Sequence, residues 1–351
     1  MLELAADLLP RMRAGERVAV VTVTRVSHSA PRGTGASMAV TAAGQVIGSI
    51  SGGCVEGDAV MLALGALHAS AGLTARFGFS DTQAHAAGLA CGGAIDVIAY
   101  PIGPDDALVI DALEAALRDE PVAIGLVIRD DETRPGQPSR VGCIVAASAD
   151  DPESSILTLT HSPRPRLVVL GAGDYAAALC RVASVAGFAV TVCDAWGLLV
   201  TRERFPDAAE LVTALPHEYL RAEAERLDPR TAVCVLTHDE RLDVPALGEA
   251  LRLPVAFVGA LGARPTVARR AELLRAEGVS EAELARLHSP LGLDLGAVTP
   301  EETAISIIAE IVAARRAGSG APLRGLESPI HGQREAAAGS QRALSAGWCV
   351  A

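Results

Sequence analysis

The chain has 351 residues, half of them hydrophobic and 21% charged, so it has room for two domains and enough apolar side chains to fill their cores. Its net charge of −12 repels phosphate backbones and anionic membrane surfaces, and with only 3% aromatic residues this argues against a nucleic-acid partner. Lysine is absent, which excludes a Walker-type phosphate loop and a Schiff-base mechanism, because both require it.

Cysteine usage and the N-terminal segment bear on the cellular compartment. The odd number of seven cysteines, without the close pairs of zinc sites, argues against a disulfide framework. Residues 1–17 predict an amphipathic helix and not a signal peptide. No charge-free apolar run approaches the roughly 20 residues that cross a bilayer. We therefore expect a soluble, cytoplasmic protein with no membrane partner.

The first half of the chain predicts an α/β domain over residues 1–160. Alternating β-branched residues indicate strands that are separated by glycine turns, and apolar stretches indicate helices between them. The expected elements are strands at 17–26, 37–41 and 46–50, a helix at 56–69, a strand ending near Tyr100, a helix at 104–119, and a strand at 121–129 followed by a surface loop at 130–140.

The second half predicts a Rossmann-like, doubly wound parallel sheet over residues 167–317. A Pro/Arg-rich segment at 161–166 is typical of a linker, and 318–351 is Gly/Ala/Ser/Arg-rich and predicts a flexible tail. Strand and helix patterns alternate between them, as in βαβ units. The expected elements are strands at 167–170, 189–193, 232–236 and 255–258 and helices at 264–277, 281–287 and 300–316.

A dinucleotide-type motif opens this second domain. Gly171 and Gly173 follow a strand, with the small Ala176 at the third fingerprint position. Asp194 ends the next strand, where a carboxylate can accept hydrogen bonds from a ribose and favours NAD over NADP. Asp174 places a negative charge close to the expected phosphates, so a second interpretation stays open: the glycines serve only close packing of helix and strand.

Two further strand ends lead to the same edge of the predicted sheet. Ligands of open α/β sheets bind beyond the carboxyl ends of the strands. Thr237, His238 and Asp239 follow one strand, and Gly262 and Arg264 follow the next. His238 is a candidate proton donor or ligand contact and Arg264 a candidate phosphate clamp. Alternatively, His238 and Asp239 only cap the following helix.

Two glycine-flanked cysteines are the candidate reactive groups of the first domain. Cys54 lies in a loop that leads into a helix, and a helix N-terminus lowers the pKa of a thiol. Cys91 stands before a second glycine turn, which suggests a shared site. The flanking glycines are Gly52, Gly53, Gly92 and Gly93. The alternative is that these thiols are buried and inert, as we expect for Cys143, Cys180, Cys193 and Cys234.

One arginine turn and four isolated histidines complete the candidates. The turn at 29–35 could bring Arg32 and backbone N–H groups to an anionic ligand, or it could be a hairpin turn with a solvated arginine. His28, His68, His85 and His288 are isolated, and we expect them to be surface or core residues and not ligands.

Taken together, the motifs resemble the XdhC/CoxI family of accessory factors for xanthine dehydrogenases and related molybdenum hydroxylases. The resemblance runs in family order from about residue 15 to 316. Its motifs are Ser29-Ala-Pro-Arg32, Gly48-Ser-Ile-Ser-Gly-Gly-Cys54-Val-Glu56, Cys91-Gly-Gly93, Gly171-Ala-Gly173, Arg204-Phe-Pro206, Thr237-His-Asp239, Gly259-Ala-Leu-Gly262, His288-Ser-Pro-Leu-Gly-Leu-Asp-Leu-Gly296 and Thr299-Pro-Glu-Glu302.

The resemblance implies a cofactor-insertion factor more than a turnover enzyme. It implies binding of the molybdenum cofactor, its protection or sulfuration with a cysteine desulfurase as sulfur donor, and its delivery to a molybdenum hydroxylase client. Cys54 is the first candidate for the reactive thiol and for a contact to molybdenum, Cys91 is the second, and Glu56 and His238 complete the candidate catalytic set.

Two other readings of the sequence stay open. The chain could be an NAD-dependent oxidoreductase with His238 as acid/base, or a scaffold whose cysteines are structural. Where family members often have His, this chain has Asp174, and where they have Pro-Arg after the second Rossmann strand, it has Ala195-Trp196, which weakens an NADP site further. The high apolar content suggests a homo-oligomer.

Overall fold

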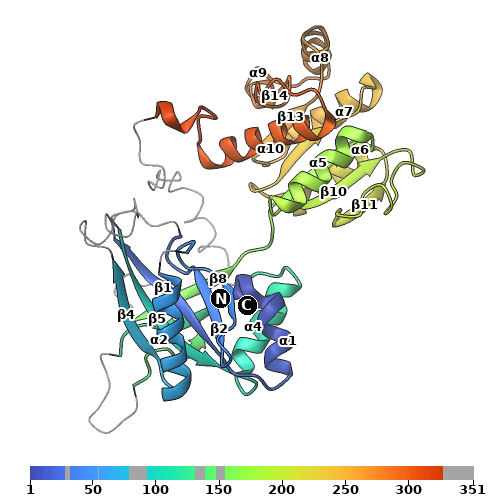
Figure 1. Cartoon of the computed structure of the whole chain (residues 1–351). Helices are drawn as coiled ribbons and strands as arrows, with labels where there is room; N and C mark the ends of the chain where they lie inside the picture. Colours follow the sequence, from blue (N-terminus) through green and yellow to red (C-terminus); the bar gives the residue numbers. More distant parts are fainter. Residues whose placement is uncertain (28–31, 54, 79–92, 131–138, 148–154, 327–351) are drawn as a thin grey trace. The chain divides into compact units, whose positions relative to one another are not determined.

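In the computed structural model, the chain forms two compact units, one from Met1 to Pro163 and one that begins at Arg164 (Figure 1). The structure describes residues 1–27, 32–53, 55–78, 93–130, 139–147 and 155–326. No helix in these ranges is both long enough and apolar enough to span a membrane.

The first unit is built on an antiparallel sheet whose described strands have the order β3-β2-β1-β5-β4. These are β1 (Val18–Ser27), β2 (Ser37–Thr41), β3 (Val46–Gly48), β4 (Leu73–Gly78) and β5 (Ala94–Ile102). The first six residues of the central strand β1 are all buried, because both faces of the sheet are covered. Alternate residues of a strand point to opposite faces, so β1 contributes to two separate cores.

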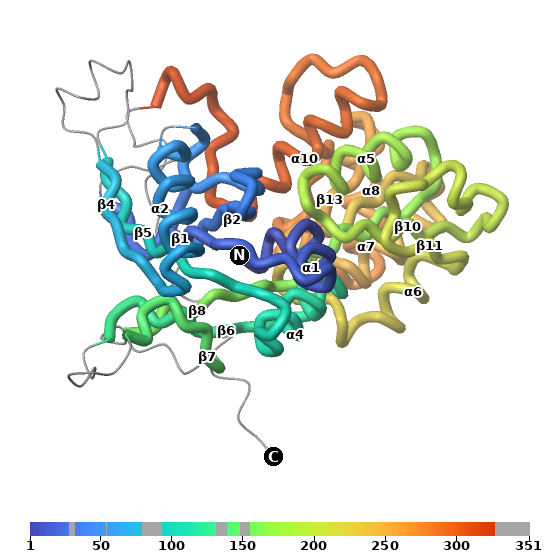
Figure 2. Tube along the Cα trace, turned by 60° about the horizontal axis from the view of Figure 1, so that its bottom comes forward, coloured from blue at the N-terminus to red at the C-terminus, as the bar shows by residue number. Residues whose placement is uncertain are grey.

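One face of this sheet packs against α2 (Glu56–Ala69), which lies across β1 and β5 (Figures 1 and 2). The opposite face packs against α1 (Ala5–Arg13) and α4 (Ala107–Leu117), and this core includes residues of a second, small antiparallel sheet. The described strands of the small sheet, in the order β7-β6-β8, are β7 (Ile144–Ala146), β6 (Val122–Val127) and β8 (Ile156–His161).

The second unit is a parallel sheet with the described strand order β11-β10-β9-β12-β13-β14. Numbered along the chain, this is the 3-2-1-4-5-6 order of a dinucleotide-binding fold, with its switch point between β9 and β12. The predicted α/β class with a Rossmann-like second half is confirmed. Its strands are β9 (Arg166–Leu170), β10 (Ala189–Asp194), β11 (Glu210–Thr213), β12 (Ala232–Val235), β13 (Phe257–Ala260) and β14 (Leu287–His288).

Helices cover both faces of the parallel sheet. On one face α5 (Asp174–Val185) packs beside α10 (Pro300–Arg316), and their cores share one apolar cluster (Figure 2). On the other face the apolar cluster contains residues of α6 (Pro216–Ala222), α7 (Glu240–Arg252) and α8 (Arg264–Ala276). As predicted, α10 begins behind Thr299, whose hydroxyl forms a capping box with Glu302.

Several predicted elements differ from the structure. The helix expected at 281–287 ends at Leu284 as α9 (Glu281–Leu284), because the chain then turns to pair Leu287 and His288 with β13. Strands β4, β8 and β11 were not predicted. Cys143 is exposed and not part of the core, because it lies in the turn before β7. In the predicted tail, residues 323–325 form one 3-10 turn, and 327–351 lie outside the described residues.

Candidate functional site

The carboxylate of Glu56, at the start of α2, organises the glycine loop that precedes this helix. Oε1 accepts hydrogen bonds from the Ser49 hydroxyl at 2.6 Å and from the Ser51 N–H at 2.9 Å. Oε2 accepts from the Ser51 hydroxyl at 2.6 Å, from the Gly53 N–H at 2.9 Å and from the Val55 N–H at 3.2 Å. Five donors from the loop therefore converge on one carboxylate.

This arrangement keeps Glu56 ionised. Partial burial acts to raise the pKa of its carboxyl, but the hydrogen bonds from Ser49 and Ser51 outweigh burial and lower the pKa to about 2. A carboxylate with so low a pKa is a poor proton donor near neutral pH. Glu56 was a candidate catalytic residue, and its geometry shows that it fixes the conformation of the loop.

The loop itself needs its glycines. Gly52 has a φ of +79° and Gly53 a φ of +118°, a region of backbone conformation that side chains with a Cβ rarely adopt. Gly93 is half-buried and directly precedes β5. The predicted site residues Cys54, Cys91 and Gly92 lie outside the described residues, so the loop is defined by its neighbours on both sides of position 54.

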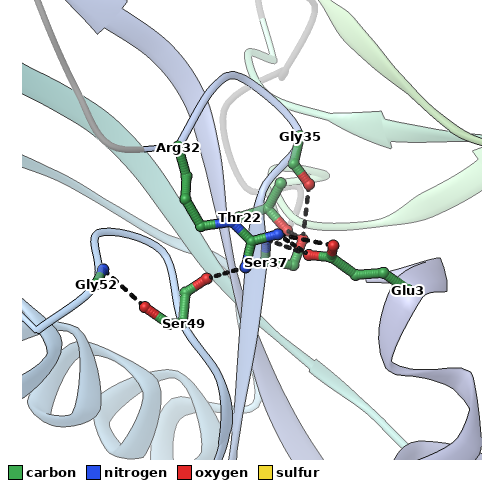
Figure 3. A network of polar contacts seen from close by, with 7 residues as sticks. All are labelled: Glu3, Thr22, Arg32, Gly35, Ser37, Ser49 and Gly52. Atoms are coloured by element: carbon green, nitrogen blue, oxygen red, sulfur yellow. Dashed lines mark hydrogen bonds and ion pairs between the residues drawn. The ribbon is translucent and has the colours of Figure 1, made fainter. Parts of the chain in front are cut away.

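Arg32 holds the same loop from its other end (Figure 3). Its Nη1 donates to the backbone oxygen of Ser49 at 2.6 Å, and its Nη2 lies 2.8 and 2.7 Å from the two carboxylate oxygens of Glu3. The Ser49 hydroxyl in turn accepts from the Gly52 N–H at 2.8 Å. Of the two interpretations of Arg32, a merely solvated turn residue does not fit these contacts.

A cavity of about 430 Å³ lies beside this ion pair. Such a volume lies within the range of small-molecule sites. Arg32 and Glu3 form part of its wall, and the rest comes from the start of the chain, the turn between β1 and β2 and three consecutive residues of β8. The lining residues are Met1, Leu2, Glu3, Arg32, Gly33, Thr34, Gly35, Ala36, Thr158, Leu159 and Thr160.

In the second unit, the glycine turn after β9 has the features of a dinucleotide fingerprint. Gly171 has a φ of +110°, and a Cβ there would lie 2.7 Å from Cγ2 of Thr237, so this glycine is required by packing. Gly173 is different, because a Cβ on it would meet no atom within 4 Å. The helix N-terminus at Gly173 is therefore open to an anionic group, as in phosphate sites of this fold.

Asp194 stands at the end of β10, where a ribose would be bound, but its oxygens already have partners. Oδ2 accepts from the Ala172 N–H at 2.8 Å and Oδ1 from the Trp196 N–H at 2.9 Å, and the residue is only 5% exposed. Asp194 thus fixes the glycine turn. Asp174, the first residue of α5, is exposed and pairs with Arg204 at 3.4 Å.

The candidates after β12 and β13 separate into different roles. Asp239 is the N-cap of α7 and accepts from the Arg241 N–H at 3.0 Å, as the capping interpretation predicted for it. His238 is exposed and has no side-chain hydrogen bond to another described residue. Gly262 lies close to the side chain of the buried Arg270, whereas Arg264 is exposed at the start of α8.

A buried ion pair that the sequence did not reveal connects the carboxyl ends of three strands. Nη2 of Arg270 lies 3.0 Å from a carboxylate oxygen of Asp243, and both side chains are 3% exposed. Asp243 accepts a short hydrogen bond from the hydroxyl of Thr237, and Arg270 donates to the backbone oxygen of Leu261 and to the hydroxyl of Ser289. Thr237 is therefore used in this network.

His288 has a fixed environment that sequence reasoning missed. Its Nδ1 lies 2.8 Å from Oε1 of Glu310 on α10, and Oε2 of Glu310 accepts from the Gly292 N–H at 2.6 Å. The imidazole also stacks on the Phe257 ring, with 4.2 Å between the ring centroids. A carboxylate partner of this kind fixes the orientation and the tautomer of an imidazole. The available signal was the family-like motif that begins at His288 and runs to Gly296.

Three of the described cysteines have thiols of low reactivity. Burial raises the pKa of the Cys180 thiol to about 11 and that of Cys193 to about 12, and it raises the pKa of Cys234 further still. Thiols with such pKa values carry almost no thiolate at neutral pH. These three residues are core residues, as predicted.

Two family models match the chain. The model of the XdhC and CoxI family matches residues 11–78, which include Arg32 and the loop held by Glu56. The model of the XdhC Rossmann domain matches residues 167–311, which is nearly the whole parallel sheet with its helices. The two matches lie in the two units that the structure separates.

Three curated relatives extend this similarity. A probable xanthine dehydrogenase subunit of Bacillus subtilis is 28% identical over 86% of this chain and 94% of its own length. The molybdenum cofactor insertion chaperone PaoD of Escherichia coli is 26% identical over 87% of this chain and 85% of its own length. The uncharacterized protein YqeB of E. coli is 36% identical over 50% of this chain, and the match spans about a third of YqeB.

A solved structure has the same fold over nearly the whole chain. It is a crystal structure of a protein from Bacillus halodurans described as a xanthine dehydrogenase. The similarity has a TM-score of 0.71 at 25% identity and covers 92% of this chain and 97% of the other. The same two-part architecture is thus present in a second protein.

Proposed function

Because the chain belongs to the XdhC and CoxI family, we propose that it is an accessory factor that binds the molybdenum cofactor and delivers it to a xanthine dehydrogenase-type client. The names of two relatives that match over most of their length support this role, since one is a molybdenum cofactor insertion chaperone and the other belongs to a probable xanthine dehydrogenase. The cofactor is then cargo and not a resident group.

The observation that carries the proposal is the loop at 49–56, which is held between Arg32 and Glu56. A loop that must present a side chain to a large ligand needs a defined backbone, and these two residues make six hydrogen bonds to it. We propose Cys54, between Gly53 and Val55, as the thiol that contacts the cargo. Thiolates are soft ligands suited to metals that bind sulfur.

The residues that the structure describes near this loop fit the pterin part of the cargo. The cavity beside Arg32 has hydroxyls, a carboxylate and backbone polar groups in its wall, which match the many donors and acceptors of a pterin. When bound, the cofactor supplies a metal with sulfur ligands, and the chain's own part is to hold it and to keep water and oxidants away.

We further propose that the protein supports sulfuration of the cofactor, with a cysteine desulfurase as the sulfur donor. In this step the Cys54 thiolate attacks the outer sulfur of the donor's persulfide. A new S–S bond forms on Cys54, and the donor's thiolate leaves. Cys91, in the second glycine turn of the sequence, is the candidate for a second thiol in this exchange.

The alternative, an NAD-dependent oxidoreductase, has less support. The carboxylate expected to bind a ribose holds two backbone N–H groups and is only 5% exposed, so a ribose has little access to it. The proposed acid/base His238 is exposed and lacks an orienting partner among the described side chains. A bound dinucleotide would need Asp194 to accept further donors, although the open space at Gly173 leaves room for a phosphate.

Replacement of single thiols tests the proposal. The parent chain and the variants Cys54→Ser, Cys91→Ser and Cys143→Ser are purified anaerobically, and bound molybdopterin is measured by fluorescence after oxidation, alongside activation of an apo-hydroxylase. We expect Cys54→Ser to lose at least about tenfold in retained cofactor. Cys143 is exposed but lies away from the loop in sequence, so its variant is the matched control. Retention equal to that of the parent in both Cys54→Ser and Cys91→Ser contradicts the thiol mechanism.

A further inference from the structure

The cavity beside Arg32 has a wall with an unusual combination of groups. On one side stand the carboxylate of Glu3 and the guanidinium of Arg32, with side chains that are 45% and 35% exposed. Around them lie the hydroxyl-bearing residues Thr34, Thr158 and Thr160. All of these residues belong to the first unit. The cavity therefore offers acceptors and donors in one small volume.

Glu3 retains hydrogen-bonding capacity beyond its contacts to Arg32 and Ser37. A single nitrogen of Arg32, Nη2, lies 2.8 Å from Oε1 and 2.7 Å from Oε2, and the Ser37 N–H lies 3.4 Å from Oε1. A carboxylate has about four lone-pair sites. Among the contacts of the described residues, at least one lone-pair site on Oε2 therefore accepts no hydrogen bond. The 3.4 Å contact from the Ser37 N–H to Oε1 is long, so a better-placed donor can replace it.

The charge of this wall selects the class of ligand. Glu3 neutralises Arg32. The third ionisable group of the wall is the Met1 α-amino group, and burial lowers its pKa to about 5, so the wall offers no surplus cation at neutral pH. A free phosphate would meet the Glu3 carboxylate. A carboxylate with available lone pairs favours a planar group with two adjacent N–H donors, as in the pairing of guanidinium with carboxylate. A neutral heterocycle with such an edge gains these hydrogen bonds without the cost of burying an unpaired charge.

We propose that the cavity lined by Glu3, Arg32 and the three threonines binds the 2-amino-4-oxopyrimidine edge of a pterin. Glu3 accepts from the 2-amino group and the adjacent ring N–H. The threonine hydroxyls and the remaining N–H groups of the Arg32 guanidinium donate hydrogen bonds to the ring nitrogens and the 4-oxo group of the pterin. The identity of the pterin as part of the molybdenum cofactor rests on the proposed function.

The same arginine connects this subsite to the loop at position 54. Arg32 contacts Glu3 through Nη2 and the backbone oxygen of Ser49 through Nη1 (Figure 3). The Ser49 hydroxyl in turn donates to Glu56. The cavity and the loop are thus connected through Arg32. A ligand with a pterin at one end and a metal-bearing group at the other can be held by both, which is why a maturation factor would need this arrangement.

Binding of free pteridines tests the subsite without the metal. The full chain is titrated with 6-hydroxymethylpterin, with the matching 6-hydroxymethyllumazine, in which an oxo group replaces the 2-amino donor, with guanosine and with inorganic phosphate. We expect the pterin to bind at least about tenfold more tightly than the lumazine. In Glu3→Gln this preference is lost, whereas Glu114→Gln, which alters a surface carboxylate on α4, binds like the parent.

Several outcomes overturn the proposal. Equal affinity for the pterin and the lumazine would show that the 2-amino group is not recognised. Guanosine binding as tight as pterin binding would show that the cavity is a site for a purine nucleoside. Tight phosphate binding identifies an anion site instead. Because Glu3→Gln also disturbs Arg32, the variant Thr158→Val tests the part of the wall that β8 contributes. Unchanged pterin affinity in both variants refutes the subsite.

Failure of the subsite and failure of the proposed function give different results. If the purified chain retains molybdopterin but free pterin does not bind, and Glu3→Gln also retains it, the subsite is wrong and the proposed function stands. If free pterin binds with the expected preference but the parent retains no molybdopterin and activates no client, the subsite stands and the proposed function fails.

Discussion

Replacement of Glu56 by glutamine tests the main physical claim about the loop at 49–56, namely that one carboxylate holds it in shape. The amide keeps the length of the side chain but exchanges one acceptor oxygen for an NH₂ donor. Oε1 accepts from two donors and Oε2 from three, so at least two donors lose their partner in Glu56→Gln.

The magnitude follows from the pKa of Glu56. A pKa lowered from 4.5 to about 2 corresponds to about 3 kcal/mol of preference for the ionised form in the folded loop. Glu56 is partly exposed, so water screens these contacts and replaces some of them. We therefore expect Glu56→Gln to destabilise the closed loop by about 1–2 kcal/mol, which raises the population of the open loop by about 5- to 30-fold.

Hydrogen–deuterium exchange of the full chain measures this opening at the peptide that contains residues 49–56. The contribution of a carboxyl with a lowered pKa is complete above its ordinary pKa near 4.5 and is lost as the pH falls through about 2. As the pH is lowered from 4.5 to about 2, we expect the protection of the parent loop against exchange to fall, once the rates are corrected for intrinsic exchange. The protection of Glu56→Gln does not fall in this range. Glu114→Gln is the control. Equal exchange in Glu56→Gln and the parent at pH 7 refutes the reasoning.

Three further predictions concern packing and thiol chemistry. Gly171→Ala lowers the free energy of unfolding of the second unit by about 2 kcal/mol or more in thermal denaturation, because position 171 has a positive φ and a Cβ there would meet Thr237. The control Gly173→Ala changes this free energy by less than about 0.5 kcal/mol, because a Cβ there meets no atom within 4 Å. Arg270→Met leaves Asp243 buried without its cation and costs about 3–5 kcal/mol in urea denaturation, so a loss below about 1 kcal/mol would contradict a structural ion pair. Iodoacetamide labels the exposed Cys143 faster than the buried Cys180, Cys193 and Cys234, as mass spectrometry of the native chain can check. Equal labelling rates would show that burial does not protect the three thiols.

The Rossmann domain could be predicted because its signals are local. Apolar β-branched strands, the spacing of Gly171 and Gly173 and the acid at Asp194 lie within one βαβ stretch of the sequence. Strand β4 was missed although Leu73, Ala75 and Phe77 alternate with polar or small residues, because its half-buried edge position weakens the pattern. Strand β11 was missed because it is a short edge strand of four residues.

The candidate residues of the site show where sequence reasoning stops. The sequence places Glu56 close to serines and glycines, but the number of donors that reach its carboxylate depends on how the loop folds back at Gly52 and Gly53. Asp194 was expected to bind a ribose, and its partners turned out to be backbone N–H groups of neighbouring turns. Chemistry at such positions depends on which lone pairs remain free.

The sequence by itself determined the class of each domain, because strand and helix periodicity and glycine turns act over a few neighbouring residues. Only the tertiary structure decided which side chains meet. Glu3 and Arg32 are 29 residues apart, Asp243 and Arg270 are 27 apart, and His288 and Glu310 are 22 apart, and each pair forms when separate elements pack. No local pattern encodes these pairings, since a hydrogen bond or ion pair depends on distance in space and on exclusion of water, and both arise only in the folded chain.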